Sequence, residues 1–515
     1  MAGKIWSREQ LWRLFTVAIF LTLSIAGFGF SVYLFFVAKT VMLYVIAMLF
    51  LLLSVISGFF NVMASYWYYK SFDYDLYVSE TTKALRPMRS FPAVSVVMPT
   101  HDESPAMIRR NIKRLKALRY PKGRLNLYLL NDSNDARIKS ELERACRDLG
   151  ITFIYRSTNK GFKAGAINNF LKHTKDEYIA IFDADEYLVD RNFLLDVMPY
   201  FQDKGISYVQ TEKRYRKGTF FSDSVDIFDA FFFRFIETAR AMDHTAIFSG
   251  SCGVIRRSVI DSVGGMPEYA IEDTFFSLES DLKGYRGFYL PKVYARGEPI
   301  RTFSKLAKQQ WRYNFGDTQF ILYYLSKPER KAKDLLAKIN YMAHGFGLNY
   351  LSVMLILFTV LSTAIVFSSL PFAHINLSIF SITHLGMLEI AELLGLFAFI
   401  LSMFAPAILT KIYFKSFRKG VMVFLLNYAL AFVRAKAAIS VFFGKEKRLN
   451  WTSRSESNSS ILRVISKTRV EMAFVGIMSG LGLFALMQNN IAGGIWLIWY
   501  GVMYSLTTIF LYKYG

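Results

Sequence analysis

Long runs of uncharged apolar residues stand on both sides of a polar stretch, and they restrict this chain to a membrane-associated fold. Residues 14–38 and 41–69 contain no charged side chain, and each run is long enough to cross a hydrocarbon core. Residues 70–340 mix polar and apolar side chains and contain no uncharged run of that length. We therefore expect a polar domain inserted between membrane spans.

Four further spans are predicted after the polar stretch, which gives six in all; they cover residues 346–373, 385–410, 472–487 and 492–512. The apolar run at 421–443 is different because it contains Arg434 and Lys436. If it crossed the membrane, the basic groups before and after it would lie on opposite sides, which the positive-inside rule disfavours. We predict an interfacial helix or a re-entrant pair there.

Charge and cysteine content restrict the compartment. The formal net charge is +22, and Lys4, Arg8 and Arg13 precede the first span. This pattern predicts a multi-pass protein of the cell membrane, in contact with its lipids, with both termini and the polar domain in the cytosol. The two cysteines, Cys146 and Cys252, form no CxxC pair and suit a reducing compartment. The basic residues are dispersed and the sequence contains no motif of a nucleic-acid-binding domain, so nucleic-acid binding is not expected.

The polar stretch alternates between strand and helix patterns, which predicts a mainly parallel α/β sheet. Expected strands cover residues 94–98, 126–130, 151–155 and 178–182, and expected helices cover 106–118 and 138–149. Ligands of such sheets bind at the carboxyl ends of the strands. Glu103, Asp132 and Asp185 each follow a strand, so we expect a nucleotide at that edge.

Asp183 and Asp185 stand one residue apart at the end of an apolar strand. Paired carboxylates can hold a divalent cation on a sugar-nucleotide diphosphate, because hard cations that also bind phosphate prefer oxygen ligands. By itself an Asp-x-Asp pair is a weak signal, and a solvated acidic loop is the alternative.

Further motifs follow in a fixed order, and together they resemble family 2 glycosyltransferases. The likeness is to the membrane-embedded processive branch that includes cellulose, hyaluronan and chitin synthases. The segments are 99–103 (Pro-Thr-His-Asp-Glu), 131–133 (Asn-Asp-Ser), 160–168 (Lys-Gly-Phe-Lys-Ala-Gly-Ala-Ile-Asn), 250–252 (Gly-Ser-Cys), 271–273 (Ile-Glu-Asp), 309–313 (Gln-Gln-Trp-Arg-Tyr) and 449–454 (Leu-Asn-Trp-Thr-Ser-Arg). The chain departs from the family pattern at Asp102, Asn131, Ile271, Tyr313 and residues 449–451.

The resemblance implies a GT-A-like cytosolic domain with a mixed, mainly parallel sheet, placed between α-helical transmembrane segments with interfacial helices. The expected organisation is two transmembrane helices at 1–70, the glycosyltransferase domain at 90–300, interfacial helices with the Gln-Gln-Trp-Arg-Tyr motif at 301–345, two transmembrane helices at 346–412, an interfacial helix and gating loop at 413–470, and two transmembrane helices at 471–515.

Roles follow from the same resemblance and from the needs of sugar transfer, in which a diphosphate must be neutralised and an acceptor hydroxyl deprotonated. Asp273 is expected to be the general base, oriented by Glu272. Asp185 and Asp183 are expected to hold Mg²⁺ or Mn²⁺. The nucleotide sugar is assigned to Glu103, Asp132, Lys163, Asp183, Gln309 and Arg312; the acceptor to Gly250, Ser251, Cys252, Trp311 and Tyr313; and a gating loop to Thr452 and Arg454.

Ordinary structural roles are the alternatives for several of these residues. Asp273 could be an acid favoured at a helix N-terminus, and Arg312 could contact lipid headgroups. Trp311 and Tyr313 could pack in a core, and residues 449–454 could be a solvated linker.

Three functions compete. The first is an inverting, processive hexosyltransferase that polymerises a nucleotide-linked hexose or N-acetylhexosamine, with UDP the expected nucleotide, into a β-linked glycan and exports it. The second is a single transfer to a polyprenyl phosphate or glycolipid acceptor. The third, a transporter with a nucleotide-binding domain, needs no general base. An accessory subunit or oligomer is compatible with each.

Overall fold

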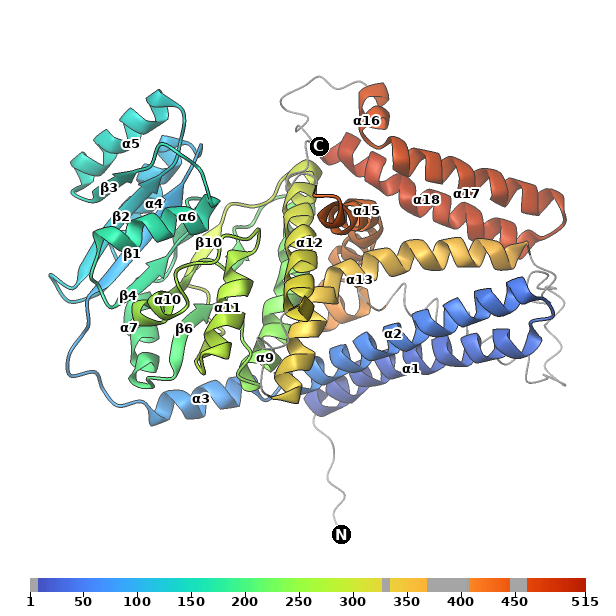
Figure 1. Ribbon diagram of the computed structural model, residues 1–515, viewed down its shortest axis with the longest axis horizontal. Helices are drawn as coiled ribbons and strands as arrows, with labels where there is room; N and C mark the ends of the chain where they lie inside the picture. The colour runs from blue at the N-terminus through green and yellow to red at the C-terminus, as the bar shows by residue number, and fades with distance from the viewer. Residues whose placement is uncertain (1–7, 327–333, 368–404, 406, 445–460) are drawn as a thin grey trace, which may run out of the picture.

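A computed structural model describes residues 8–326, 334–367, 405, 407–444 and 461–515. Figure 1 shows a sheet-containing domain at one end of the molecule and long helices running away from it at the other. Helix α12 (Phe303–Ser326) lies across the boundary between the two parts.

The central sheet has seven strands in the order β3-β2-β1-β4-β8-β6-β9. Strand β8 runs antiparallel to both of its neighbours, and the remaining neighbouring pairs are parallel. The mixed, mainly parallel sheet expected from the sequence is therefore confirmed. Its strands are β1 (Val94–Thr100), β2 (Leu125–Asn131), β3 (Thr152–Tyr155), β4 (Tyr178–Ile181), β6 (Ile206–Thr211), β8 (Gly253–Arg256) and β9 (Arg286–Leu290).

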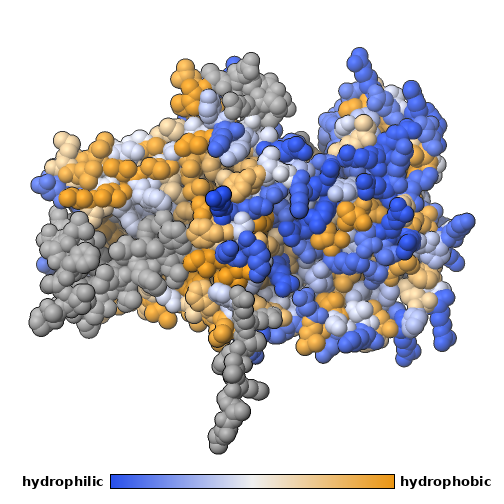
Figure 2. All heavy atoms as spheres, turned by 180° about the vertical axis from the view of Figure 1, so that it is seen from behind, coloured by the Kyte–Doolittle hydropathy of each residue, from blue (hydrophilic) through white to orange (hydrophobic). Residues whose placement is uncertain are grey.

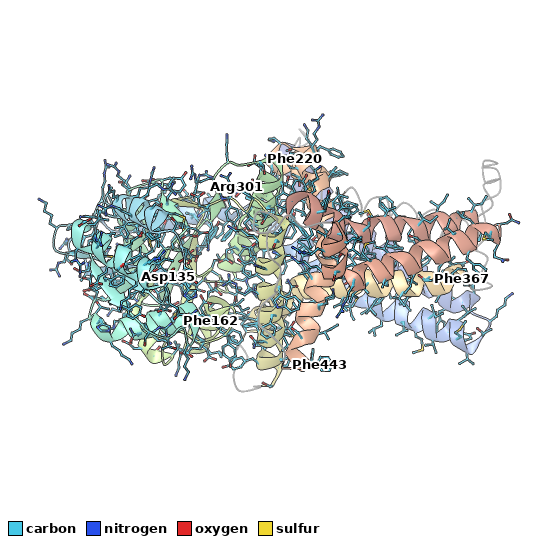
Figure 3. All side chains as sticks on the ribbon, turned by 90° about the horizontal axis from the view of Figure 1, so that it is seen from above. Asp135, Phe162, Phe220, Arg301, Phe367 and Phe443 are labelled. Carbon is cyan, nitrogen blue, oxygen red and sulfur yellow. The ribbon has the colours of Figure 1, made fainter. Side chains whose placement is uncertain are left out.

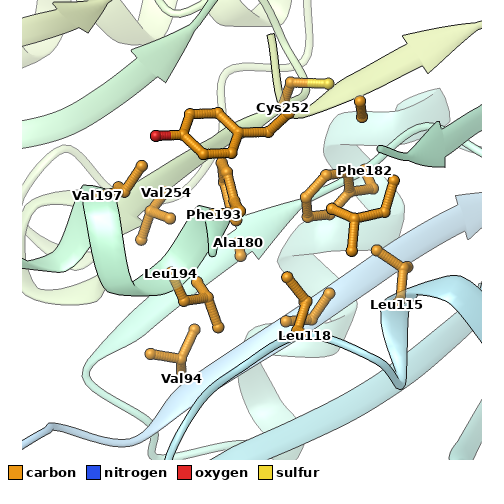
Figure 4. Close-up of a cluster of buried hydrophobic side chains, with 14 of the residues drawn as sticks. Val94, Leu115, Leu118, Ala180, Phe182, Phe193, Leu194, Val197, Cys252 and Val254 are labelled. Carbon is orange, nitrogen blue, oxygen red and sulfur yellow. The ribbon is translucent and has the colours of Figure 1, made fainter. Parts of the chain in front are cut away.

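Alternation along the strands builds a core on each face of the sheet. In β1, Val94 and Val96 belong to one buried cluster, whereas Val97 belongs to the cluster on the opposite face. In β4, Ala180 and Ile181 divide in the same way. Figure 4 shows the first cluster.

Helices cover both faces. Those packed on the first cluster are α4 (Pro105–Leu115), α5 (Ala136–Leu149), α7 (Phe193–Val197) and the short 3₁₀ helix η2 (Met198–Gln202). Those packed on the second are α6 (Phe162–Phe170), η1 (Leu171–His173), α10 (Arg257–Ser262) and α11 (Glu272–Leu282).

A small second sheet stands beside the first, in the order β5-β10-β7. Its strands are β5 (Glu186–Leu188), β7 (Arg214–Tyr215) and β10 (Ala295–Gly297). The turn between β4 and β5 contains Asp183 and Asp185, so this turn connects the two sheets.

Connecting helices join the sheet domain to the apolar helices. They are α3 (Tyr74–Ala84), α8 (Phe220–Phe231), the π-helical segment η3 (Phe232–Glu237) and α9 (Thr238–Met242). Phe235 of η3 stacks on Tyr68 with ring centroids 4.1 Å apart. Aromatic contacts therefore attach the sheet domain to the apolar part.

In the described part of the chain, five helices are long and apolar enough to cross a membrane, and a bent helix raises this to six. They are α1 (Arg8–Val37), α2 (Val41–Ser71), α15 (Phe417–Phe442), α17 (Arg469–Met487), α18 (Ile491–Tyr514) and the bent α13 (Leu335–Val366); a short helix, α16 (Ile461–Lys467), precedes α17. Figure 2 shows that hydrophobic side chains gather on this end of the molecule and hydrophilic ones on the other.

Helix α15 occupies the run for which we predicted an interfacial position. It packs against α12, α13 and α18, and most of its side chains are buried. By its length and composition, this helix could also cross the membrane. Most of the expected span at 385–410, and the expected gating loop with Thr452 and Arg454, lie outside the described residues.

Candidate active site

Acidic side chains meet at one edge of the main sheet. Glu103 follows β1, Asp132 follows β2, and Asp183 and Asp185 follow β4. These three strands are parallel and adjacent, so their carboxyl ends lie together. All four side chains line one cavity of about 1870 Å³.

The turns after β1 and β2 are fixed by hydrogen bonds. Both carboxylate oxygens of Asp132 accept from Arg156, with Nε–Oδ1 at 3.0 Å. Glu103 Oε2 accepts from the backbone N–H of His101 at 2.7 Å. Asn131, which stands where the family has aspartate, is fully buried and donates to Thr100 Oγ1 at 3.1 Å. Asp132 therefore shapes this wall with its charge already balanced.

Asp183 faces two ammonium groups. Lys163 Nζ donates to its Oδ1 at 2.5 Å and to the Gly250 carbonyl at 2.7 Å. Lys213 Nζ lies 3.7 Å from its Oδ2 and 3.5 Å from Glu186 Oε1. Burial alone would raise the pKa of Asp183, but the two lysines outweigh it and hold that pKa below its usual range. Asp183 is thus an ionised carboxylate that positions two cations at the cavity wall.

Asp185 differs from Asp183 because no lysine or arginine that the structure describes forms an ion pair with it, and Lys213 opposes its pKa shift only from a distance. Burial, followed by the nearby charges of Asp183 and Glu186, raises its pKa to about 7. A divalent cation beside Asp185 would relieve this repulsion.

The residues present fit a cation that is shared with substrate. Among the described residues, no group of three or more His, Cys, Asp or Glu side chains is arranged to hold a metal by itself. Mg²⁺ and Mn²⁺ on phosphate substrates are commonly bound by one or two carboxylates together with phosphate oxygens. Asp185 supplies such a carboxylate, whereas both oxygens of Asp183 already face lysines.

Glu272 and Asp273 begin helix α11 and line the cavity. Asp273 Oδ1 accepts from the Thr274 N–H at 2.9 Å. Burial, then the charge of Asp273, raises the pKa of Glu272 to about 7. Burial also raises the pKa of Asp273, against the opposing effect of Lys163. A pKa near 7 suits Glu272 to proton transfer near neutrality, and the pKa of Asp273 is shifted in the same direction.

Gly250 makes room for Asp273. Its φ is +82°, and a Cβ built on it would lie 2.9 Å from Asp273 Oδ2 and 3.5 Å from Lys163 Nζ. A glycine is required here both by backbone conformation and by space.

Helix α12 carries the Gln-Gln-Trp-Arg-Tyr motif along the cavity. Arg312 is exposed and makes no hydrogen bond or ion pair with any residue that the structure describes. Gln309 Nε2 donates to the hydroxyls of Tyr313 at 3.2 Å and Tyr215 at 3.1 Å. The Tyr215 hydroxyl donates to Asp229 Oδ2 at 3.0 Å. This network fixes Tyr313 next to a guanidinium that is free to pair with a ligand.

Three of the expected acceptor residues do not reach the cavity surface. Ser251 is fully buried and donates to Glu186 Oε1 at 2.7 Å. Cys252 is buried with φ +53°. Trp311 packs in a core formed by α8, α12, α15 and α18, and its indole N–H has no hydrogen-bond partner in the described part of the chain. The motif therefore presents Arg312 and Tyr313 to the cavity and Trp311 to the core.

Sequence analysis missed Lys213 and Glu186. Strand β6 is parallel to β4 through the intervening antiparallel β8, so its carboxyl end, followed by Lys213, reaches the same edge of the sheet. The rule that located the acidic residues would have found Lys213 had β6 been predicted.

The cavity does not end at the sheet. Its donor half is the part around Lys163, Asp183, Asp185, Asp273 and Arg312. Its membrane half is lined by one stripe from each of α1, α2, α13 and α18, and in α2 the stripe follows three- and four-residue spacing. Its polar and aromatic lining includes Ser54, Ser57, Phe60, Asn61, Tyr350, Phe358, Ser362, Tyr428, Trp496, Trp499 and Tyr500. Figure 3 shows α13 extending from the sheet domain to its far end at Phe367.

Known proteins resemble this chain over its sheet domain. The family model for glycosyl transferase family 2 matches residues 95–264. The cellulose synthase catalytic subunit [UDP-forming] of Pseudomonas fluorescens (strain SBW25) is 30% identical over 237 residues, which is 44% of this chain and 31% of that protein. Glucomannan 4-beta-mannosyltransferase 1 of Oryza sativa subsp. japonica is 27% identical over 281 residues, which is 50% of this chain and 52% of that protein.

Among solved structures, the mannosyltransferase PcManGT from Pyrobaculum calidifontis, in complex with GDP-Man and Mn²⁺, aligns with a TM-score of 0.49 at 18% identity. The alignment covers 75% of this chain and 100% of that one. The matches to the cellulose synthase and mannosyltransferase sequences span about a third to a half of those proteins.

Proposed function

Because residues 95–264 form a family 2 glycosyltransferase domain, we propose that the chain is a processive glycan synthase. It transfers a sugar from a nucleotide donor to a growing chain and passes the product into the membrane half of the cavity. The observation that carries this proposal is the continuity of one cavity from Asp183 and Asp273 to the stripes of α2, α13 and α18. A single-transfer enzyme needs no such extension.

The donor half suits a nucleoside diphosphate sugar. Lys163, Lys213 and Arg312 supply three cations where the diphosphate leaving group would lie. Preorganised cations stabilise the charge that develops on a leaving group, and the forked donors of Arg312 match phosphate oxygens. Glu103 and the turn at Asp132 form the wall for base and ribose.

Asp273 acts as general base in this proposal. Its carboxylate lies against Gly250, at the point where the donor half meets the acceptor path, and Glu272 precedes it on α11. It takes the proton of the acceptor hydroxyl as that oxygen attacks the anomeric carbon and the nucleoside diphosphate departs from the opposite face. A single displacement of this kind inverts an α-linked donor to a β-linked product.

The metal role belongs to Asp185. A bound Mg²⁺ or Mn²⁺ would supply positive charge to the diphosphate. Asp185 would hold it, and Asp183 would keep Lys163 and Lys213 in place beside it.

The membrane half suits a glycan. Flat aromatic faces pack on the apolar CH faces of sugar rings, and hydroxyl and amide groups exchange hydrogen bonds with sugar hydroxyls. Tyr350, Trp496 and Trp499 provide such faces, with Ser57 and Asn61 among the polar groups.

Orientation completes the proposal. The start of α15 lies near the sheet domain, since Lys419 pairs with Asp223 of α8 at 2.9 Å. Lys411, Lys415 and Arg418 stand close to it in sequence. Basic residues of membrane proteins gather on the cytosolic side, and this pattern supports a cytosolic position for the sheet domain of a multi-pass protein.

The test is to supply purified enzyme in lipid nanodiscs with radiolabelled nucleotide sugars, one at a time, and to size the products. One donor should give a ladder of water-soluble glycan extending to high mass, and Asp273→Asn should give none. A lipid-extractable product carrying one sugar would favour transfer to a polyprenyl phosphate or glycolipid instead. Absence of transfer from every donor would contradict both.

A further inference from the structure

Past Tyr313, the next side chain of α12 on the cavity wall is an acid that no catalytic step uses. Asp317 lies four residues after Tyr313, so it is about 6 Å further along the helix. It lines the cavity and is 8% exposed. This advance is comparable to the length of one pyranose unit.

Among the described residues, Asp317 has no hydrogen-bond partner. Nε2 of His344 lies 3.9 Å from its Oδ1, beyond hydrogen-bond reach. A buried polar group without a partner is costly unless a ligand or water completes it. Burial raises the pKa of Asp317 well above its ordinary value, so the side chain can present an O–H as well as oxygen acceptors.

His344 faces the same space from α13. It lines the cavity, with the ring of Phe232 at 6.3 Å and the ring of Phe320 at 6.1 Å, centroid to centroid. Its imidazole can donate from one nitrogen and accept at the other. An acid and an imidazole beside the ring of Phe232, which also lines the cavity, can bind a sugar ring and its hydroxyls.

The charges of this region exclude an anion. Of the described residues that line the cavity, the lysines and arginines are Lys163, Lys213, Arg214 and Arg312, all in the donor half. The charge of Asp273 acts on Asp317 as a second acid. Arg434 is fully buried behind the wall, where its Nε donates to Gln310 and its Nη1 to Asn427. A phosphate or carboxylate placed beside Asp317 would therefore meet an acid without a cation beside it at the cavity surface.

We propose that Asp317 and His344 form the subsite for the second sugar of the acceptor, and that this subsite takes an uncharged glycan and rejects an acceptor bearing phosphate or carboxylate. The inference rests on the proposed function and adds the chemical class of its acceptor. The terminal sugar lies at Arg312 and Tyr313, and the next sugar places its hydroxyls between the carboxyl and the imidazole.

The test compares acceptors of one and two sugars in the reconstituted full-length enzyme, with the donor identified as above. Two rates are recorded: transfer to the acceptor, and hydrolysis of the donor without acceptor. Wild type should have a lower KM for the neutral disaccharide than for the monosaccharide. Asp317→Leu should raise the disaccharide KM roughly five- to tenfold, the effect of losing one or two hydrogen bonds, and leave monosaccharide transfer and donor hydrolysis within about twofold.

Matched variants keep the result interpretable. Asp317→Asn retains a donor and an acceptor and should restore most of the disaccharide affinity. Asp148→Leu, on the exposed surface of α5, should change nothing. His344→Leu should raise the same KM, and the double variant should add little, because both residues bind one sugar.

The outcomes separate the inference from the proposed function. If wild type extends neutral glycans but Asp317→Leu keeps the disaccharide KM, the subsite is wrong and the synthase stands. The subsite is also wrong if a uronic-acid disaccharide is used as well as the neutral one. If wild type transfers to polyprenyl phosphate and to no oligosaccharide, the proposed function itself fails.

Discussion

The two halves of the cavity hold their polar groups in different ways. In the donor half, Asp183 and Lys163 are fixed by short contacts to each other and to the backbone. In the membrane half, the lining is a set of stripes on long helices. On α12, past the donor half, Asp317 has no hydrogen-bond partner in the described structure. Chemistry at an anomeric carbon requires charges fixed in advance, since reorganisation would cost rate. Movement of a glycan requires contacts that are replaced at each step.

This contrast predicts that substitutions in the donor half change rate by orders of magnitude and that substitutions in the membrane half change it modestly. The largest effect is expected at Asp273. Asp273→Asn removes the proton acceptor but keeps the shape, so transfer should fall by roughly two to four orders of magnitude while donor binding persists. Timed transfer assays measure the rate, and calorimetry measures nucleotide binding. A loss smaller than tenfold would mean that another group takes the proton.

The next effect concerns Gly250. Gly250→Ala places a Cβ within 2.9 Å of Asp273 Oδ2, and displacement of a reacting group should lower transfer roughly tenfold to a hundredfold. Gly264→Ala is the matched control, because its φ of +86° imposes the same backbone strain with open space around the Cβ. Both variants should lose similar thermal stability, and only Gly250→Ala should lose activity. Equal activity in the two variants would contradict the inference that Asp273 needs the space left by Gly250.

A third prediction uses the raised pKa of Asp185. Below about pH 7 this carboxyl holds a proton that a cation must displace, so Mn²⁺ affinity should rise up to about tenfold per pH unit as pH increases and level off above that pKa. Calorimetry of Mn²⁺ binding with nucleoside diphosphate present measures this slope, and chelation by EDTA should stop transfer. Asp185→Asn should bind Mn²⁺ weakly, and its Mn²⁺ affinity should change less with pH. Full activity in excess chelator would contradict the metal assignment.

The smallest effect is expected in the membrane half. Trp499→Leu removes one aromatic ring that can stack on a sugar, an interaction of about 1 kcal/mol. The glycan product should therefore become a few-fold shorter, while donor hydrolysis is unchanged. Phe484→Leu, on an exposed position of α17 outside the cavity lining, is the control. A loss of donor hydrolysis in Trp499→Leu would show that the two halves are not separable.

The sequence allowed the donor half to be located because its residues obey local rules. Short apolar runs closed by polar turn residues predicted β1, β2 and β4, and the turns after them contained Glu103, Asp132 and Asp185. Lys213 was missed because β6 was not predicted. The match to the family motif also could not decide which aromatic faces the cavity, because Trp311 and Tyr313 are two residues apart on α12 and point in different directions.

The membrane half could not be predicted in the same way. Uniformly apolar runs such as 41–69 do not mark which stripe faces a cavity, because lipid and cavity wall select similar residues. Asp317 and His344 come together only through packing of α12 on α13. The roles of Thr452 and Arg454 stay a prediction.

We propose that one continuous cavity makes the glycan at one end and carries it at the other. Asn61 and Val62 are neighbours on α2, and Asn61 lines the membrane half whereas Val62 is exposed on the outer face. The measurement is polymer synthesis and donor hydrolysis in Asn61→Trp and Val62→Trp, both in nanodiscs. We expect Asn61→Trp to abolish long polymer but keep donor hydrolysis, and Val62→Trp to keep both. Long polymer at the wild-type rate from Asn61→Trp would contradict it.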